Sequence, residues 1–217
     1  MLLLVLLPLS AWAQISADGV ISMGRNALYY EDYVLSIQYF NQAIEAKPYL
    51  YAPYYYRAVA KYYLGDYVGA VNDCTASIER DPFIDDCYRL RAICLIMTGD
   101  YQKASDDYRL LIHRKSEDQA IWYNLVLCQA QQKLFAPADS LLDEMIGKWP
   151  NYARCYMLKA QIALEQKDTL SADRLIDKTL QIDSFHVDAL AAKAMLCMRK
   201  DSFARAEQYY DKAIVQS

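Results

Sequence analysis

The feature that most constrains the fold of this chain is an internal repeat of 34 residues. One mark of it is a grid of places 34 residues apart, occupied by Pro48, Pro82, Ser116 and Pro150. The tripeptide Gly-Asp-Tyr also occurs twice at this spacing, at 65–67 and 99–101. Repetition at such a period indicates small structural units that stack on their neighbours, because one unit cannot bury its own apolar face.

A grid that begins at Ala17 divides the chain into six units without gaps. The units span residues 17–50, 51–84, 85–118, 119–152, 153–186 and 187–217, and the last lacks three residues. The eighth place holds small or branched residues, namely Gly24, Ala58, Ala92, Val126, Ala160 and Ala194. The fourth place is mostly aromatic, with Val20, Tyr54, Tyr88, Trp122, Tyr156 and Leu190. Small places opposite large ones allow two helices to approach closely and fill a shared core.

Each unit is predicted to be a pair of antiparallel helices. Apolar places recur at helical spacings within a unit. Gly65 and Gly99 suit the end of a first helix, and Asp66 and Asp100 suit the start of a second. The proline places then end the second helix, because proline cannot continue it. The fold class is therefore all-α, with helices of about 14 residues and about 20 Å in length.

These landmarks resemble those of the tetratricopeptide repeat (TPR) family. The resemblance covers residues 17–217 and is clearest in residues 54–82, where the large, small, aromatic, Ala and Pro places are in register. It implies a right-handed superhelical solenoid of antiparallel helix pairs. The departures are Ser116 and Ser184 where Pro is usual, and Lys133 and Lys167 where Gly is common.

The seventh place, often Leu in the family, holds arginine in units two and three. Arg57 and Arg91 are each followed sixteen residues later by an aspartate, Asp73 and Asp107. Since these places lie on the two helices of one hairpin, we predict the ion pairs Arg57–Asp73 and Arg91–Asp107. The alternative is that all four are unrelated solvated charges.

By the resemblance, the first helices line a concave face that takes a peptide or helix of a protein partner. The candidate partner-binding residues form a tyrosine-rich, apolar groove: Arg25, Tyr29, Tyr55, Val59, Tyr62, Tyr63, Arg89, Ile93, Met97, Tyr123 and Leu127. Aromatic and arginine residues often dominate binding energy. The alternative is that about half of these tyrosines only pack helix on helix. The family's clamp for a C-terminal carboxylate is not expected, because the ninth place lacks Asn.

Nothing in the sequence indicates catalysis, a metal or a cofactor. There is no glycine-rich phosphate loop, no HExxH and no GxSxG. His113 and His186 each stand alone and suit surface positions. The six cysteines have no zinc-site spacing and are predicted to be apolar fillers. Cys74 and Cys87 are the one pair worth testing for a disulfide, with free thiols favoured. The net charge of −4, with scattered Lys and Arg, disfavours nucleic acid as a partner.

Residues 1–13 resemble a signal peptide. An apolar run is followed by Ala11-Trp12-Ala13, a small-x-small pattern that predicts cleavage before Gln14. No Lys or Arg precedes the run, so a buried helix is the alternative. Export would place a bacterial-type protein in the periplasm or outside the cell, and otherwise it is cytoplasmic. No later segment approaches a membrane span, and no small-molecule substrate is expected.

The chain ends inside the sixth unit, without the polar capping helix that repeat arrays usually need. We therefore expect a truncated fragment, or a partner that covers Ala213 and Ile214. The leading interpretation of function is a protein-interaction scaffold rather than an enzyme. The alternative is a sensor or assembly module of a longer multidomain protein.

Overall fold

The structure is a computed structural model that describes residues 16–215, so the predicted signal peptide at 1–13 lies outside the described residues. The described part of the chain contains twelve helices and no strand. The helices are α1 (Ala17–Tyr29), α2 (Tyr33–Ala46), α3 (Ala52–Tyr63), α4 (Tyr67–Arg80), α5 (Asp85–Met97), α6 (Tyr101–His113), α7 (Gln119–Gln131), α8 (Phe135–Lys148), α9 (Ala153–Glu165), α10 (Thr169–Ile182), α11 (Val187–Arg199) and α12 (Phe203–Ile214). Each of the six 34-residue ranges contains two of them.

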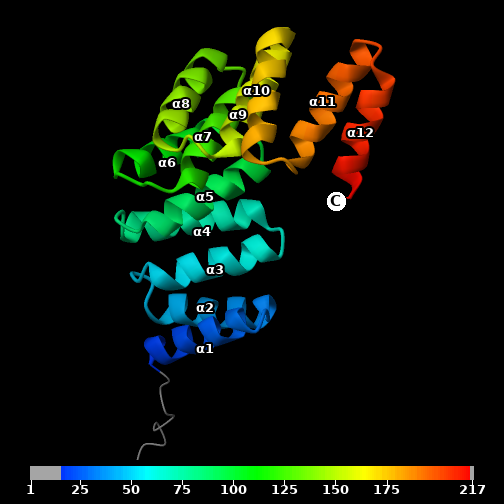
Figure 1. The fold of residues 1–217 in the computed structure, drawn as a ribbon. Helices are drawn as coiled ribbons and strands as arrows, with labels where there is room; N and C mark the ends of the chain where they lie inside the picture. Colours follow the sequence, from blue (N-terminus) through cyan, green and yellow to red (C-terminus); the bar gives the residue numbers. More distant parts are fainter. Residues whose placement is uncertain (1–15, 216–217) are drawn as a thin grey trace, which may run out of the picture. The chain divides into compact units, whose positions relative to one another are not determined.

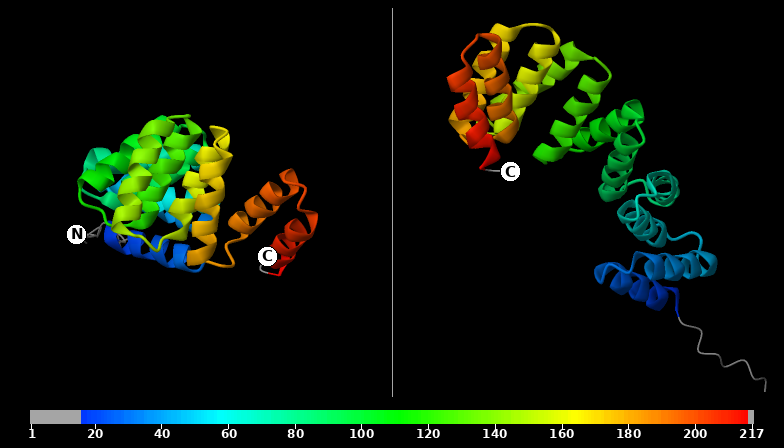
Figure 2. Two further views of the ribbon diagram at one scale, coloured as in Figure 1. Left: turned by 45° about the horizontal axis from the view of Figure 1, so that its top comes forward. Right: turned by 90° about the vertical axis from the view of Figure 1, so that its right-hand side faces the viewer.

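The described helices form two compact units that divide between Asp107 and Tyr108, within α6. In the first unit α1 packs on α2 and α3 on α4, as antiparallel hairpins that stack on each other (Figure 1). In the second unit the pairs are α7 with α8, α9 with α10 and α11 with α12. Figure 2 shows the same hairpins from two further directions. The prediction of an all-α fold of paired antiparallel helices is confirmed.

One residue in the left-handed conformation closes each hairpin turn. Gly65 (φ 78°) and Gly99 (φ 82°) have this role, as the sequence predicted, and it needs no Cβ to be accommodated. Four other turns use residues with a side chain, with φ between 53° and 66°: Glu31, Lys133, Lys167 and Asp201. The departures at Lys133 and Lys167 thus keep the backbone of the glycine turns, at a cost of about 1 kcal/mol each.

The aromatic fourth place of a unit fixes the turn that precedes it. Three tyrosines donate their hydroxyl to the carbonyl six residues earlier, at 3.0–3.2 Å, in the pairs Tyr54–Pro48, Tyr88–Pro82 and Tyr156–Pro150. Trp122 donates its ring N–H to the carbonyl of Ser116 at 2.8 Å. Because the acceptor is a backbone carbonyl, serine fills this place of the proline grid without losing the bond.

The core is built from small residues where helices approach closely. Ala58, Ala92, Ala160 and Ala194 of the eighth place are completely buried. The six cysteines are free thiols, and five of them are buried. Burial raises the pKa of the Cys94 thiol to about 11 and that of Cys155 to about 12, which keeps both thiols protonated and unreactive. The interpretation of the cysteines as apolar fillers is confirmed.

Candidate protein-binding surface

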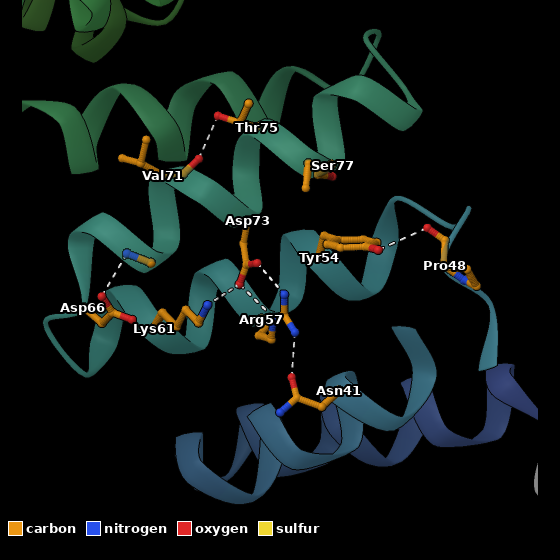
Figure 3. A network of polar contacts seen from close by, with 12 residues as sticks. Asn41, Pro48, Tyr54, Arg57, Lys61, Asp66, Val71, Asp73, Thr75 and Ser77 are labelled. Atoms are coloured by element: carbon orange, nitrogen blue, oxygen red, sulfur yellow. Dashed lines mark hydrogen bonds and ion pairs between the residues drawn. The ribbon is translucent and has the colours of Figure 1, made fainter. Parts of the chain in front are cut away.

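The predicted ion pair between Arg57 of α3 and Asp73 of α4 is present (Figure 3). Arg57 donates Nε to Asp73 Oδ2 at 2.8 Å and Nη2 to Oδ1 at 2.5 Å. Asp73 is only 4% exposed. The remaining nitrogen of Arg57 donates to Asn41 of α2 at 2.6 Å, and Lys61 Nζ lies 2.8 Å from Asp73 Oδ2. This network therefore fastens α3 both to α4 and to the preceding hairpin.

The second predicted pair, Arg91 with Asp107, has the same geometry. Arg91 donates Nε and Nη2 to the two carboxylate oxygens at 2.8 and 2.6 Å, and Nη1 to the hydroxyl of Thr75 at 3.2 Å. The hydrogen bond to Asp107 raises the pKa of the Arg91 guanidinium. Both predictions are confirmed, and both arginines hold the hairpins together.

Nine of the eleven candidate partner-binding residues lie on the first helices of the first unit. They are Arg25 and Tyr29 on α1, Tyr55, Val59, Tyr62 and Tyr63 on α3, and Arg89, Ile93 and Met97 on α5. None of the nine is fully buried. Tyr29, Tyr63 and Met97 are 80%, 59% and 55% exposed. Large apolar side chains thus remain open on each of the three helices.

Some of these tyrosines also take part in packing. The Tyr62 ring lies 5.9 Å from that of Tyr67 on α4, so Tyr62 joins the two helices of its hairpin. The Tyr63 ring stacks on that of Tyr33, with centroids 5.0 Å apart. Burial, followed by the charge of Asp86, raises the pKa of Tyr55 to about 12. The packing alternative therefore describes Tyr62 and part of Tyr55, whereas Tyr29 and most of Tyr63 face solvent.

A pocket of about 410 Å³ opens beside α1 and the start of α3. Its lining residues are Asp18, Ile21, Ser22, Arg25, Leu50, Tyr51, Ala52 and Tyr56. The Arg25 guanidinium carbon lies 5.1 Å from the centre of the Tyr56 ring, a cation–π arrangement. Sequence reasoning found Arg25 but missed Tyr56, because the family's lining places include Tyr55 and not its neighbour.

The other two candidate residues, Tyr123 and Leu127, lie on α7 in the second unit. The Tyr123 ring contacts that of Tyr152 at 6.3 Å, and the Arg154 guanidinium carbon lies 4.3 Å from its centre. Burial raises the pKa of Tyr123. Leu127 lines a smaller pocket of about 150 Å³, together with Leu158 of α9. Both residues are partly buried, so they offer less open surface than Tyr29 or Tyr63.

No group of three or more His, Cys, Asp or Glu residues within 16–215 could hold a metal ion. His113 is exposed and His186 is partly buried. None of the helices in the described part of the chain is long and apolar enough to cross a membrane. Near the end of the described chain, Ile214 is 69% exposed and Ala213 is 8% exposed.

The helix hairpins, the left-handed turn residue and the linked fourth and thirty-second places together define a TPR-type array. No protein-family model and no curated protein sequence matches the chain. Solved structures do match its fold. The chain is similar to YrrB, described as a TPR protein with an unusual peptide-binding site, with 17% identity over 82% of this chain and 92% of that one, and a TM-score of 0.59.

Two further structures are similar in the same way. A tetratricopeptide repeat protein from Parabacteroides merdae has 12% identity, coverage of 96% of this chain and 81% of that one, and a TM-score of 0.68. The first TPR of Spaghetti (RPAP3), bound to the HSP90 peptide SRMEEVD, has 17% identity, coverage of 54% and 93%, and a TM-score of 0.52. At these identities the likeness establishes the fold, and this chain has the TPR fold.

Proposed function

We propose that this chain is a protein-interaction scaffold that binds a peptide or helix of a partner along the first helices of its hairpins. The observation that carries the proposal is the exposure of Tyr29, Tyr63 and Met97, one at the same repeat place on each of α1, α3 and α5. A row of large apolar side chains costs free energy in water unless a partner covers it. The scaffold acts by binding and not by catalysis.

The pocket beside Arg25 and Tyr56 supplies an anchor for such a partner. Its volume of about 410 Å³ lies in the range of about 300–1,000 Å³ that is typical of ligand pockets. Ile21 and Leu50 give it apolar walls, and the guanidinium of Arg25 gives it a polar end. Partners often insert one large side chain into a pocket of this kind.

The similar structures support the proposal by analogy. YrrB is described as having a peptide-binding site, and the first TPR of Spaghetti (RPAP3) is described as bound to a peptide. The alternative function, a sensor or assembly module of a longer protein, would use the same surface. It differs in requiring an effector region outside the sequence.

A capture experiment tests the groove. The chain is immobilised, partners are captured from an extract of the source organism, and the affinity of the identified partner is then measured. We expect the triple variant Arg25→Ala, Tyr63→Ala, Met97→Ala to lose capture, because these side chains are open and their removal disturbs the core little. A matched control is Leu170→Ala, which removes a 64% exposed apolar side chain from the second helix α10. If the triple variant captured as well as the control, the groove assignment would be wrong.

Export is a further part of the proposal and rests on residues 1–13 alone. Expression of the full chain with its own N-terminus, followed by intact-mass measurement of the periplasmic fraction, tests it. A mature protein that begins at Gln14 is the expected result. An uncleaved chain that remains in the cytoplasm would contradict export.

A further inference from the structure

Seven large apolar side chains gather at the two turns that close the hairpins α1–α2 and α3–α4. They are between 37% and 80% exposed: Tyr29, Tyr30, Val34, Leu35, Tyr63, Leu64 and Val68. We call the two turn segments, 29–35 and 63–68, the tyrosine edge. Scattered apolar residues are normal on a protein surface, but a contiguous group marks an interaction site.

Ring contacts join the two turns into one surface. The rings of Tyr33 at the start of α2 and Tyr63 at the end of α3 are parallel within 11° and have centroids 5.0 Å apart. Tyr29 contacts Tyr30 edge-on at 5.2 Å, and Tyr62 contacts Tyr63 in the same way at 5.4 Å. The tyrosine edge therefore runs across two hairpins within the first unit.

The charge of the tyrosine edge has one sign. Its two segments contain the carboxylates Glu31, Asp32 and Asp66, and they contain no Lys or Arg. All three acidic residues are exposed. Asp32 and Asp66 accept the N–H groups of Leu35 and Gly69 as helix caps, which holds both carboxylates at the edge. Residues 16–107 as a whole carry thirteen Asp and Glu against eight Lys and Arg, a net charge of −5.

We propose that the tyrosine edge docks a protein segment that combines Lys or Arg with aliphatic or aromatic residues. Its cationic groups would pair with the three carboxylates and lie over tyrosine rings, while its apolar parts cover Tyr30, Val34 and Val68. An acidic segment is disfavoured by the like charges. This surface goes beyond the groove proposed above, since it lies on the hairpin turns. Tyr30, Val34, Leu64 and Val68 are not among the groove residues.

The repeat itself supplies a matched pair of charge reversals. Glu31 occupies the left-handed turn place with φ 61°, and Lys133 and Lys167 occupy the same place in other hairpins with φ 59° and 66°. Lysine is therefore compatible with this backbone, and Glu31→Lys reverses a charge at the tyrosine edge without new strain. Asp201→Lys makes the same change of net charge at the same place of the α11–α12 hairpin, where φ is 53°.

Two short synthetic peptides with identical Leu and Tyr residues are the probes. One has Lys at every polar position and the other has Glu, and each is titrated with the full chain by fluorescence anisotropy. We expect the Lys peptide to bind and the Glu peptide not to bind. Glu31→Lys should weaken the Lys peptide about tenfold, since one attraction becomes a repulsion, and Asp201→Lys should leave its affinity unchanged.

Two further variants separate this surface from the groove. Val34→Ser with Val68→Ser should weaken the Lys peptide, whereas Arg25→Ala with Met97→Ala should not. Equal binding of the two peptides, no binding of either, or equal losses in Glu31→Lys and Asp201→Lys would each overturn the proposal. Sedimentation of the same variants detects a different occupant. If Glu31→Lys changed self-association and left peptide binding unchanged, the edge would be a contact between copies of the chain.

Discussion

The seventh place of the repeat carries a cation in both compact units, and each unit uses that cation differently. In the first unit Arg57 and Arg91 each hold one buried aspartate of their own hairpin with two nitrogen atoms. In the second unit the place holds lysine, and each lysine reaches back to two carboxylates of the preceding hairpin. Its pairs are Lys159 with Asp139 and Asp143 at 3.2 and 2.5 Å, and Lys193 with Asp173 and Asp177 at 2.6 and 2.5 Å.

The difference follows from the shapes of the two side chains. A guanidinium is a planar fork that matches a carboxylate, so it can satisfy a buried aspartate. An ammonium is a point charge on a flexible stem, so it bridges separate carboxylates that remain in contact with water. The exposed fractions of the partner side chains agree, at 6% for Asp73 against 64% for Asp143. The first unit thus fastens each hairpin internally, and the second fastens hairpin to hairpin.

The largest effect should come from removing a buried carboxylate of the first unit. Asp73→Ala should lower the free energy of unfolding by about 3 kcal/mol, because Arg57 then loses its partner in a buried site. Asp143→Ala is the matched change in the second unit and should cost less than about 1 kcal/mol, since its partner is exposed. Hydrogen exchange on peptides from α3, α4, α8 and α9 measures both. Equal losses would show that the two kinds of fastener do not differ.

A smaller effect should separate two tyrosines that occupy the same place. Tyr54 donates to the carbonyl of Pro48 and also accepts a hydrogen bond from Arg80 at 2.9 Å, whereas Tyr156 donates to Pro150. We expect Tyr54→Phe to cost about 1.5 kcal/mol and Tyr156→Phe about 1 kcal/mol. Urea denaturation followed by circular dichroism measures both. A larger loss for Tyr156→Phe would contradict the role given to Arg80.

The hairpin turns provide a comparison in which the two variants should have opposite signs. Gly65→Ala should destabilise the first unit by about 1 kcal/mol, because φ of 78° is unfavourable for a residue with a Cβ. Lys167→Gly should stabilise the second unit by about 0.5 kcal/mol, since relief of the same strain exceeds the added freedom of the unfolded chain. Thermal unfolding checks both signs. A stabilising Gly65→Ala would show that the turn is not under backbone control.

The fold and the arginine pairs were predictable because each depends on fixed spacing. A 34-residue period sets the helix pairs, and a separation of sixteen residues places Arg57 beside Asp73 whatever the neighbouring hairpins do. The lysine bridges were not predictable in this way. Lys159 reaches the preceding hairpin, and several carboxylates lie within reach of its flexible stem.

The candidate site was predictable in part for a related reason. Family places identify which residues lie on the first helices, and these side chains are at least partly open. They do not identify Tyr56, which contacts Arg25 through the packing of α1 on α3. They also do not identify the tyrosine edge, because its exposure depends on how two neighbouring turns approach each other. The stacking of Tyr33 on Tyr63, 30 residues apart, is a property of the assembled hairpins.

The smallest effect concerns the pH dependence of a lysine bridge. Burial alone would raise the pKa of Asp173, but hydrogen bonds from Lys193 and Lys200 outweigh it and hold the pKa below its usual range. A carboxyl whose pKa is lower in the folded chain stabilises the fold above its unfolded pKa of about 3.9, and that contribution is lost as the pH falls through the folded value.

Asp173→Asn should therefore cost less than about 1 kcal/mol at neutral pH, since the pair is partly exposed, and nothing below about pH 2. Urea denaturation of both chains at a series of pH values measures the difference. Trp122 and Trp149 lie in the second unit, so their fluorescence follows the unit that contains this bridge. If the difference between the two chains stayed constant from neutral to strongly acidic pH, Asp173 would contribute through shape rather than charge. The lysine bridges would then resemble the buried arginine pairs more closely than their exposure suggests.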